Sequence, residues 1–412
     1  MTSWQEVKLG DICEITSSKR IFMADYVALG IPFYRSKEII EKQRGNDIST
    51  ELFITEEKYE EIKQKFSVPQ EGDILLTSVG TLGIPYVVRK NERFYFKDGN
   101  LTWIKKSNSL LPKYLYYFFI SSEGKLKLEN ISIGTTQKAI TIVGLKSLEI
   151  PLPPFDVQKK IAGVLGALDD KIELNNKINN NLEQQAQALY VNNIELYKER
   201  NIKVEDIVIT ANTGADAIQK APIVDYDTGV KCVRVGDMSN KRSYSDWGYA
   251  KVTDDVFFQY QLKKDDIIVT RTASLGLNTI ISKNLDAVYN NGLIRLTINK
   301  DVIVPLLVYR QFQTDDFKNY ISKIEGETSV RPNMKINYLL QYSFAVMNKE
   351  KQKELIKVLE PLWNKQEQLI EENTRLAAIR DALLPKLMSG EIDVSNVDIS
   401  ALTSTDKLSF TK

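Results

Sequence analysis

The run GDILLT at residues 72–77 recurs as DDIIVT at residues 265–270, 193 positions further along the chain. Both runs are short, rich in branched aliphatic residues and preceded by acidic residues, which is typical of buried strands. The same offset relates TLG at residues 81–83 to SLG at residues 274–276, and Leu-Pro at 111–112 to Val-Pro at 304–305. Solenoid repeats span only about 20–50 residues, so this long period indicates a tandem domain duplication.

Each copy contains signals for both strands and helices. In the first copy, short β-branched or aromatic runs predict strands at residues 73–77, 86–89, 94–96 and 101–104. Thr55 with the acids after it predicts a helix start, and Pro112 predicts another helix, which reaches about Ser121. The second copy repeats this order. Each copy therefore predicts a mixed α+β domain of about 150 residues, enough to bury a core.

A long helical segment follows each domain. After Pro151-Leu152-Pro153-Pro154, Asp156 can cap a helix that continues to about Leu196, and a heptad pattern of apolar residues extends along it. Residues 355–383 carry the same pattern in the same register, with Pro361 expected to bend that helix. Chain order makes the pair antiparallel, because the second helix has to run back toward the first domain. The alternative is two amphipathic helices that each pack on their own domain.

Asn179 and Asn373 occupy equivalent positions of this heptad pattern. One hypothesis is that the two side chains meet and fix the register of the helix pair, as buried Asn does in coiled coils. The alternative is that both are solvated at the edge of the helix contact.

The predicted fold is thus α+β. Two homologous mixed α/β domains are separated by two long helices that form an antiparallel coiled coil with pseudo-two-fold symmetry. The expected parts are residues 1–154, 155–198, 199–347 and 348–390, followed by a disordered tail at 391–412.

Composition narrows the chemistry. The 412 residues include no histidine, which excludes His-dependent triads, HExxH zinc sites and histidine general acid–base catalysis. Two cysteines cannot build a disulfide framework or a Cys-rich zinc site, so we expect no metal site. The net charge of +1 lacks the strong basic excess of a lone nucleic-acid binder. Without an apolar signal segment or a membrane span, we expect a soluble cytoplasmic protein.

The ordered motifs resemble a known family along essentially the whole chain. They are Gly30-Ile31-Pro32-Phe33-Tyr34-Arg35, Glu71-Gly72-Asp73-Ile74-Leu75, Gly134-Thr135-Thr136-Gln137, Ile150-Pro151-Leu152-Pro153-Pro154 with Gln158, and the segment from Leu383 to Ile392. This pattern resembles the specificity subunit (S subunit, HsdS) of type I restriction–modification systems. The resemblance implies two target-recognition domains that bind a split double-stranded DNA sequence. It also implies two methyltransferase (M) subunits and added restriction (R) subunits as partners.

Loops equivalent between the two copies supply the candidate DNA-binding residues. Base and phosphate recognition uses Arg, Lys, amide and hydroxyl side chains. The first domain offers Lys19, Arg20, Arg35, Ser78, Thr81, Thr136, Gln137 and Lys138. The second offers Arg234, Arg271, Ser274, Asn278, Ser329 and Arg331. Because Arg35 and Arg234 match across the copies, we expect them to support the scaffold or contact phosphate rather than read different bases.

Catalysis is not expected in this chain. It has no GxxxxGK[ST] loop, and Leu152-Pro153-Pro154-Phe155 lacks the Asn or Asp of a base-methylation motif. A nuclease pattern built from Asp98 with Glu123 and Lys125 fits poorly. S-adenosylmethionine, ATP and Mg are therefore expected in partner subunits, with no cofactor here.

The exposed flank of the helix pair is the expected docking surface for methyltransferase subunits. Its candidate residues are Leu174, Tyr190, Tyr197 and Ile370, whereas Trp363 is expected in the core. Two other functions stay open at this stage. One is a DNA-recognition subunit of a related defence or methylation system, and the other is a coiled-coil adaptor without DNA binding.

Overall fold

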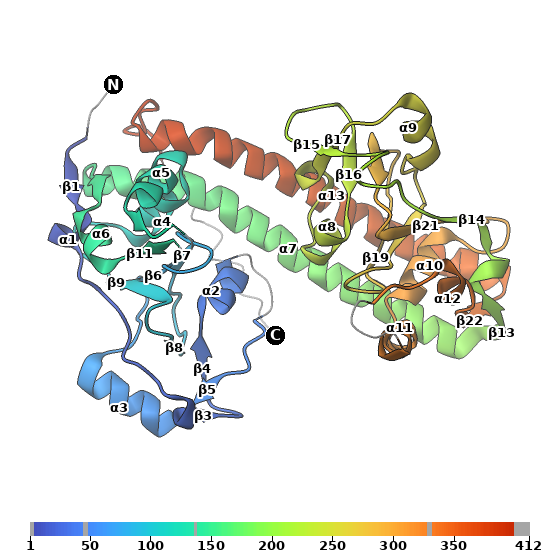
Figure 1. Cartoon of the computed structure of the whole chain (residues 1–412), viewed down its shortest axis with the longest axis horizontal. Helices are drawn as coiled ribbons and strands as arrows, with labels where there is room; N and C mark the ends of the chain where they lie inside the picture. The colour runs from blue at the N-terminus through green and yellow to red at the C-terminus, as the bar shows by residue number, and fades with distance from the viewer. Residues whose placement is uncertain (1–3, 44–47, 136–137, 328–331, 399–412) are drawn as a thin grey trace. The chain divides into compact units, whose positions relative to one another are not determined.

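The structure is a computed structural model that describes residues 4–43, 48–135, 138–327 and 332–398. The chain forms two compact units (Figure 1). Unit 1 comprises residues 1–174 and 375–412, and unit 2 comprises residues 175–374. The long helices α7 (Phe155–Tyr197) and α13 (Lys349–Met388) are each divided between the units, so each unit contains a segment of both.

Unit 1 begins with short strands and helices that precede α7. In chain order they are β1 (Glu6–Lys8), α1 (Leu9–Ile12), β2 (Ile15–Thr16), η1 (Met23–Asp25), β3 (Tyr26–Val27), β4 (Ile31–Tyr34), α2 (Ser36–Gln43), β5 (Phe53–Ile54), α3 (Glu56–Phe66), β6 (Ile74–Thr77), β7 (Pro85–Val87), β8 (Tyr95–Phe96), β9 (Leu101–Ile104), α4 (Pro112–Ile120), α5 (Ser122–Asn130), β10 (Ser132–Ile133), β11 (Ala139–Ile140), α6 (Ile142–Ser147) and β12 (Glu149–Pro151).

Unit 2 repeats this arrangement between the two long helices. Its elements are β13 (Lys198–Lys203), η2 (Val204–Asp206), β14 (Val208–Thr213), β15 (Ile223–Val224), β16 (Lys231–Val233), α8 (Val235–Ser239), η3 (Tyr244–Asp246), β17 (Gly248–Ala250), α9 (Asp254–Tyr260), β18 (Ile267–Thr270), β19 (Asn278–Ile280), β20 (Ala287–Tyr289), β21 (Leu293–Ile298), α10 (Pro305–Phe312), α11 (Asp315–Glu327), α12 (Ile336–Leu340) and β22 (Ser343–Met347).

The sheets of the two units correspond strand for strand. Unit 1 has sheets in the order β2-β9-β6-β7 and β3-β5-β4-β8, and unit 2 has β14-β21-β18-β19 and β15-β17-β16-β20. In both units the second sheet contains one parallel pair, β4 with β8 and β16 with β20. Each unit also has a two-stranded ribbon, β1-β12 or β13-β22, and unit 1 has a further one, β10-β11. The duplication inferred from the sequence is therefore also present in the strand connections.

Local sequence explains where these elements begin. The strand runs 74–77 and 267–270 are buried at every position, as expected for the centre of a sheet. The hydroxyl of Thr55 accepts a hydrogen bond from the Lys58 backbone and caps α3. Pro112 and Pro305 stand in the first turns of α4 and α10, where a missing N–H costs nothing.

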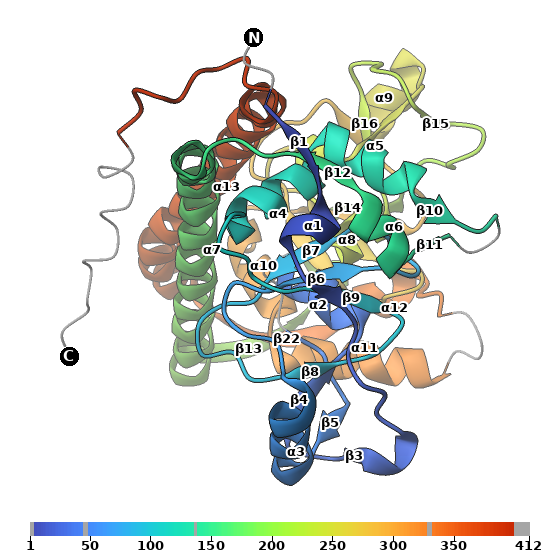
Figure 2. The same ribbon diagram turned by 90° about the vertical axis from the view of Figure 1, so that its left-hand side faces the viewer.

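In unit 1, the start of α7 packs against the end of α13. Ile161 and Leu165 share one core cluster with Leu384 and Leu387, and Arg380 pairs with Asp169 at 2.9 Å. Low numbers on α7 therefore meet high numbers on α13, which is antiparallel packing. Figure 2 shows the two segments side by side, with the β3-β5 ribbon and α3 at the opposite end of this unit from β1.

In unit 2, the second half of α7 packs against the first half of α13, again antiparallel. Tyr190 shares a core with Leu355 and Leu359. The Asn175 amide nitrogen donates to the Asn373 side-chain oxygen at 2.9 Å. Asn373 thus meets Asn175 rather than Asn179, so the expected Asn179–Asn373 pair was wrong by one helical turn. The prediction failed because two residues at equivalent positions of the repeat need not face each other across an antiparallel helix pair.

Two further expectations concern the second helix and the tail. Helix α13 continues through the exposed Pro361, and the expected bend there stays a prediction. Val394 is buried in the unit 1 core, and Ile392 and Val397 pack against it. The expected disorder is therefore wrong for residues 391–398, because their apolar side chains find a core to join, whereas residues 399–412 lie outside the described residues.

A fully buried arginine links the recognition part of unit 2 to the helix pair. Arg310 on α10 is 0% exposed, and its guanidinium lies 2.5 Å from Glu183 on α7 and 3.4 Å from Gln366 on α13. Removing one partner of a buried ion pair is costly because the remaining charge stays desolvated.

We therefore expect Glu183→Gln to destabilise the protein by about 2 kcal/mol, because Arg310 keeps its buried charge while Glu183 itself is 36% exposed. Asp170→Asn is the matched control on the same helix, since its pair with Lys113 is exposed and is worth roughly 1 kcal/mol at most. Urea denaturation measures both changes. Equal effects of the two substitutions would contradict the structural role of Arg310.

Candidate nucleic-acid interface

Each unit contains the same tight turn after its central strand. In unit 1 the turn after β6 closes when Gly83 donates to the carbonyl of Thr77 at 2.8 Å and Ile84 donates to its hydroxyl at 2.9 Å. In unit 2 the turn after β18 closes in the same way on Thr270, with Gly276 and Leu277 as donors. We call residues 78–84 and 271–277 the paired turns.

A second loop lies against each paired turn. The Ile140 backbone donates to the carbonyl of Ser78 at 2.9 Å, and Val79 bridges to Ala139. In unit 2, Met334 donates to the carbonyl of Arg271 at 2.8 Å, and Thr272 bridges to Asn333. Loops that stand about 60 residues apart in the sequence therefore form one surface in each unit.

In unit 1 the predicted residues differ in how accessible they are. Thr81 and Lys138 are exposed, and Lys138 pairs with Glu129 at 2.9 Å. Ser78 is 3% exposed, and its hydroxyl bonds with that of Thr102 at 2.6 Å. Its prediction as a DNA contact is therefore wrong for the side chain, because β9 covers it. Thr136 and Gln137 lie outside the described residues.

The loop that carries Lys19 and Arg20 in unit 1, called the basic loop, is held through its backbone, and both basic side chains are exposed. The Lys19 backbone donates to the Tyr95 hydroxyl at 2.7 Å, and its ammonium lies over the Phe66 ring at 4.8 Å. Arg20 has a 70% exposed side chain and pairs with Asp98 at 3.0 Å. Both side chains stay available to an anionic ligand.

Arg35 and Arg234 occupy the same position in the two units, each before a short helix and each paired with a buried acid. The Arg35 guanidinium donates to Glu38 at 2.7 Å, and that of Arg234 donates to Asp237 at 3.3 Å. Both acids also accept the backbone N–H of their arginine. These contacts support the scaffold role that the repeat suggested.

In unit 2, Arg271 holds the two loops together. Its guanidinium donates to the carbonyls of Met334 and Asn291, both at 3.1 Å. Asn278 donates to the carbonyls of Gly276 and Phe312, whereas Ser274 is exposed. Ser329 and Arg331 lie outside the described residues.

Large exposed apolar side chains beside the basic loop were not singled out from the sequence. Phe22 is 64% exposed and Met23 is 89% exposed, although the Asp25 carboxylate fixes their turn by accepting the Phe22 N–H at 3.1 Å. The available signal was the apolar run Ile21-Phe22-Met23 directly after Lys19-Arg20, of which only Ile21 is buried.

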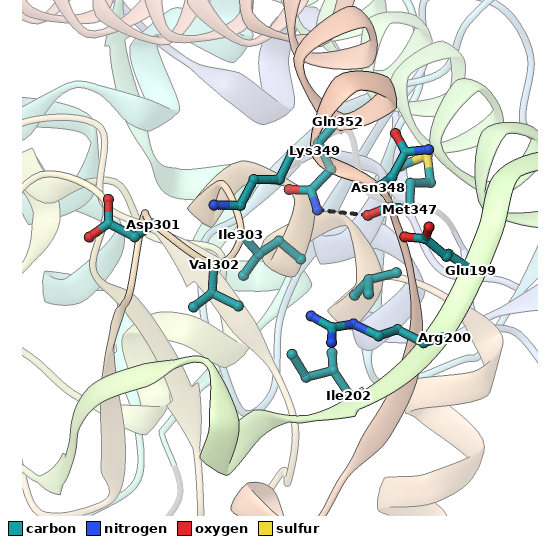
Figure 3. A pocket seen from close by; sticks show the side chains of 11 residues that line it. Glu199, Arg200, Ile202, Asp301, Val302, Ile303, Met347, Asn348, Lys349 and Gln352 are labelled. Carbon is teal, nitrogen blue, oxygen red and sulfur yellow. Dashed lines mark hydrogen bonds between the residues drawn. The ribbon is translucent and has the colours of Figure 1, made fainter.

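A pocket lined by described residues lies elsewhere in unit 2. It has a volume of about 550 Å³ between β13 and the start of α13. Figure 3 shows Glu199 and Arg200 on one wall and Asp301 on the other, and Gln352 donates to the Met347 carbonyl at 2.9 Å. Charges of both signs on the walls favour no single ligand class. Among the described residues no cluster of three or more His, Cys, Asp or Glu could hold a metal ion.

Comparisons with known proteins agree with this geometry. Residues 1–184 match the family model described as type I restriction modification DNA specificity domain. A Haemophilus influenzae protein described as a type I restriction enzyme specificity subunit is 34% identical over 199 residues, which are 47% of this chain and 46% of that relative. The MjaIX specificity subunit of Methanocaldococcus jannaschii is 25% identical over 425 residues, covering 96% of this chain and 94% of that relative.

Residues 1–184 thus match a type I DNA specificity domain, and nearly the whole chain is similar to type I specificity subunits. The crystal structure of the S subunit from M. genitalium shares the fold, with a TM-score of 0.54, 17% identity, and coverage of 93% of this chain and 96% of that one. The two relatives are each described as a specificity subunit of a type I restriction enzyme.

The predicted docking residues of this chain fall into two groups. Leu174, Tyr197 and Ile370 are 42–43% exposed. Tyr190 is 1% exposed and donates to Gln311 at 2.8 Å, so its prediction as a docking residue is wrong because α10 covers it. Trp363 packs on the unit 2 core, as expected. Within the described part of the chain, no helix is long and apolar enough for a membrane span.

The pH dependence of stability should depend partly on Glu38. Burial alone would raise the pKa of this carboxyl, but hydrogen bonds from the Arg35 side chain and backbone outweigh it, and the pKa lies below its usual value of 4.5. The lowered pKa stabilises the fold above pH 4.5, and this contribution disappears as the carboxylate protonates on further acidification. Urea midpoints should therefore fall less steeply below pH 4.5 in Glu38→Gln than in the wild type. Parallel profiles would contradict this role.

Arg271 generates a prediction about binding. Arg271→Ala removes the side-chain hydrogen bonds to the Met334 and Asn291 carbonyls and leaves the backbone contacts between the loops, so we expect roughly tenfold weaker DNA binding and relaxed specificity in one half of the target. Competition binding with duplexes altered in either half measures this change, and the unaltered half serves as the internal control. An unchanged binding profile would remove Arg271 from the interface.

Proposed function

We propose that this chain reads a split double-stranded DNA target, with one half-site contacted by the recognition domain of each unit. The main support is that the same paired surface is built twice but carries different side chains. Gly80 and Thr81 in unit 1 are replaced by Ala273 and Ser274 in unit 2. A common scaffold with divergent loops suits two different base sequences, because recognition residues are usually placed on loops.

The modest net charge of +1 fits a subunit that shares DNA binding with partners. We propose that two methyltransferase subunits dock on the exposed flanks of α7 and α13, and that restriction subunits join this assembly. Leu174, Tyr197 and Ile370 are candidate contacts, because exposed apolar side chains on helices mark interaction surfaces. Methyl transfer from S-adenosylmethionine and the Mg- and ATP-dependent steps then belong to the partners, and the assembly works in the cytoplasm.

Genome-wide mapping of methylated bases tests this proposal. Cells with the chain and its neighbouring methyltransferase should show one split motif that is absent when the chain is deleted. Replacing residues 201–347 with the corresponding domain of a relative should change one half of the motif only. Loss of both halves in a folded hybrid, or no dependence on the chain, would contradict the proposal and favour an adaptor that does not bind DNA.

A further inference from the structure

The two paired turns share a left-handed backbone position but place different residues there. Gly80 has a φ of +82° in unit 1, and the equivalent residue of unit 2, Ala273, has a φ of +61°. Both lie in the left-handed region, where a Cβ crowds the following carbonyl and glycine is the favoured residue. Ala273 therefore keeps a side chain in a conformation that disfavours one.

Packing within the chain does not account for this methyl group. Ala273 is exposed, and a Cβ built at Gly80 in the equivalent turn would meet no atom within 4 Å. The turn also cannot relax easily, because Thr270 closes its base and Arg271 ties it to Asn291 and Met334. Strained residues persist where the surrounding structure holds them, and they cluster at ligand-binding sites.

We propose that the Ala273 methyl is a specificity contact that packs against the C5 methyl of a thymine in the half-site of the second domain. This inference rests on the proposed function and extends it to one position. A lone methyl has no donor or acceptor, so the base-edge group that it can distinguish in the major groove is the thymine methyl. Ser274, exposed beside it, can supply a neighbouring polar contact.

The proposal requires opposite effects on stability and on recognition. Ala273→Gly removes the strain, so the melting temperature should rise by about 2–4 °C. The same change should weaken binding to the cognate duplex about fourfold, the loss expected for one buried methyl. Gly80→Ala is the matched variant for the strain alone and should lower the melting temperature by a similar amount.

The decisive experiment replaces each thymine of the second half-site by uracil, which lacks the methyl, in duplexes bound by the chain assembled with its methyltransferase. The wild type should lose about fourfold in affinity at one replacement, and Ala273→Gly should lose nothing further there. The contact would be overturned if no replacement changed the affinity of the wild type, or if the half-site contained no thymine. It would also be overturned if the wild type and Ala273→Gly lost the same affinity at that position. Absence of any wild-type preference for a split duplex would instead overturn the proposed function.

Discussion

The structure depends on the antiparallel contact between α7 and α13, because each unit takes part of its core from the helix that is distant in sequence. In unit 1, Leu384, Leu387 and Met388 of α13, with Val394 after it, close a core whose other buried residues lie before residue 166. In unit 2, Ala186 and Tyr190 of α7 share a core with Leu355 and Leu359 of α13. Neither recognition domain therefore has a complete core without both helices. Burial of the apolar side chains between α7 and α13 makes the main favourable contribution to the free energy of this packing.

Buried polar groups determine how these helices align. Asn175 is 0% exposed and pairs with Asn373, and Gln366 donates to Glu183 at 3.1 Å. Apolar heptads alone would tolerate a slip by one turn, whereas a slip here would leave desolvated amides and the Arg310 guanidinium without partners. The same segments that close the cores thus also fix their register.

The sequence predicted the repeat, the central strands and both long helices, because these follow from periodicity and from local start signals. Strand β6, for example, begins at Ile74 and ends at Thr77, within the predicted run 73–77.

The burial of single residues could not be predicted in the same way. Ser78 and Tyr190 look like surface residues in the sequence, and only the strand and helix that pack over them reveal their burial. The Asn175–Asn373 pair was missed because its register depends on the three-dimensional contact rather than on the repeat offset. The grouping of candidate loops into paired surfaces also required the fold, which joins Ser78 to Ile140 and Arg271 to Met334. Within the described residues, the loops were therefore identified from the sequence more successfully than the individual side chains.

The most direct measurement of the helix register is disulfide cross-linking in the full chain, since Cys13 and Cys232 are buried and do not interfere. Cysteines introduced at Asn175 and Asn373 should form a disulfide under mild oxidation, because these side chains are in contact. Cysteines at Asn179 and Asn373 should remain reduced under the same conditions. Preferential cross-linking of the second pair, or of neither pair in the folded protein, would contradict the antiparallel register on which both units depend.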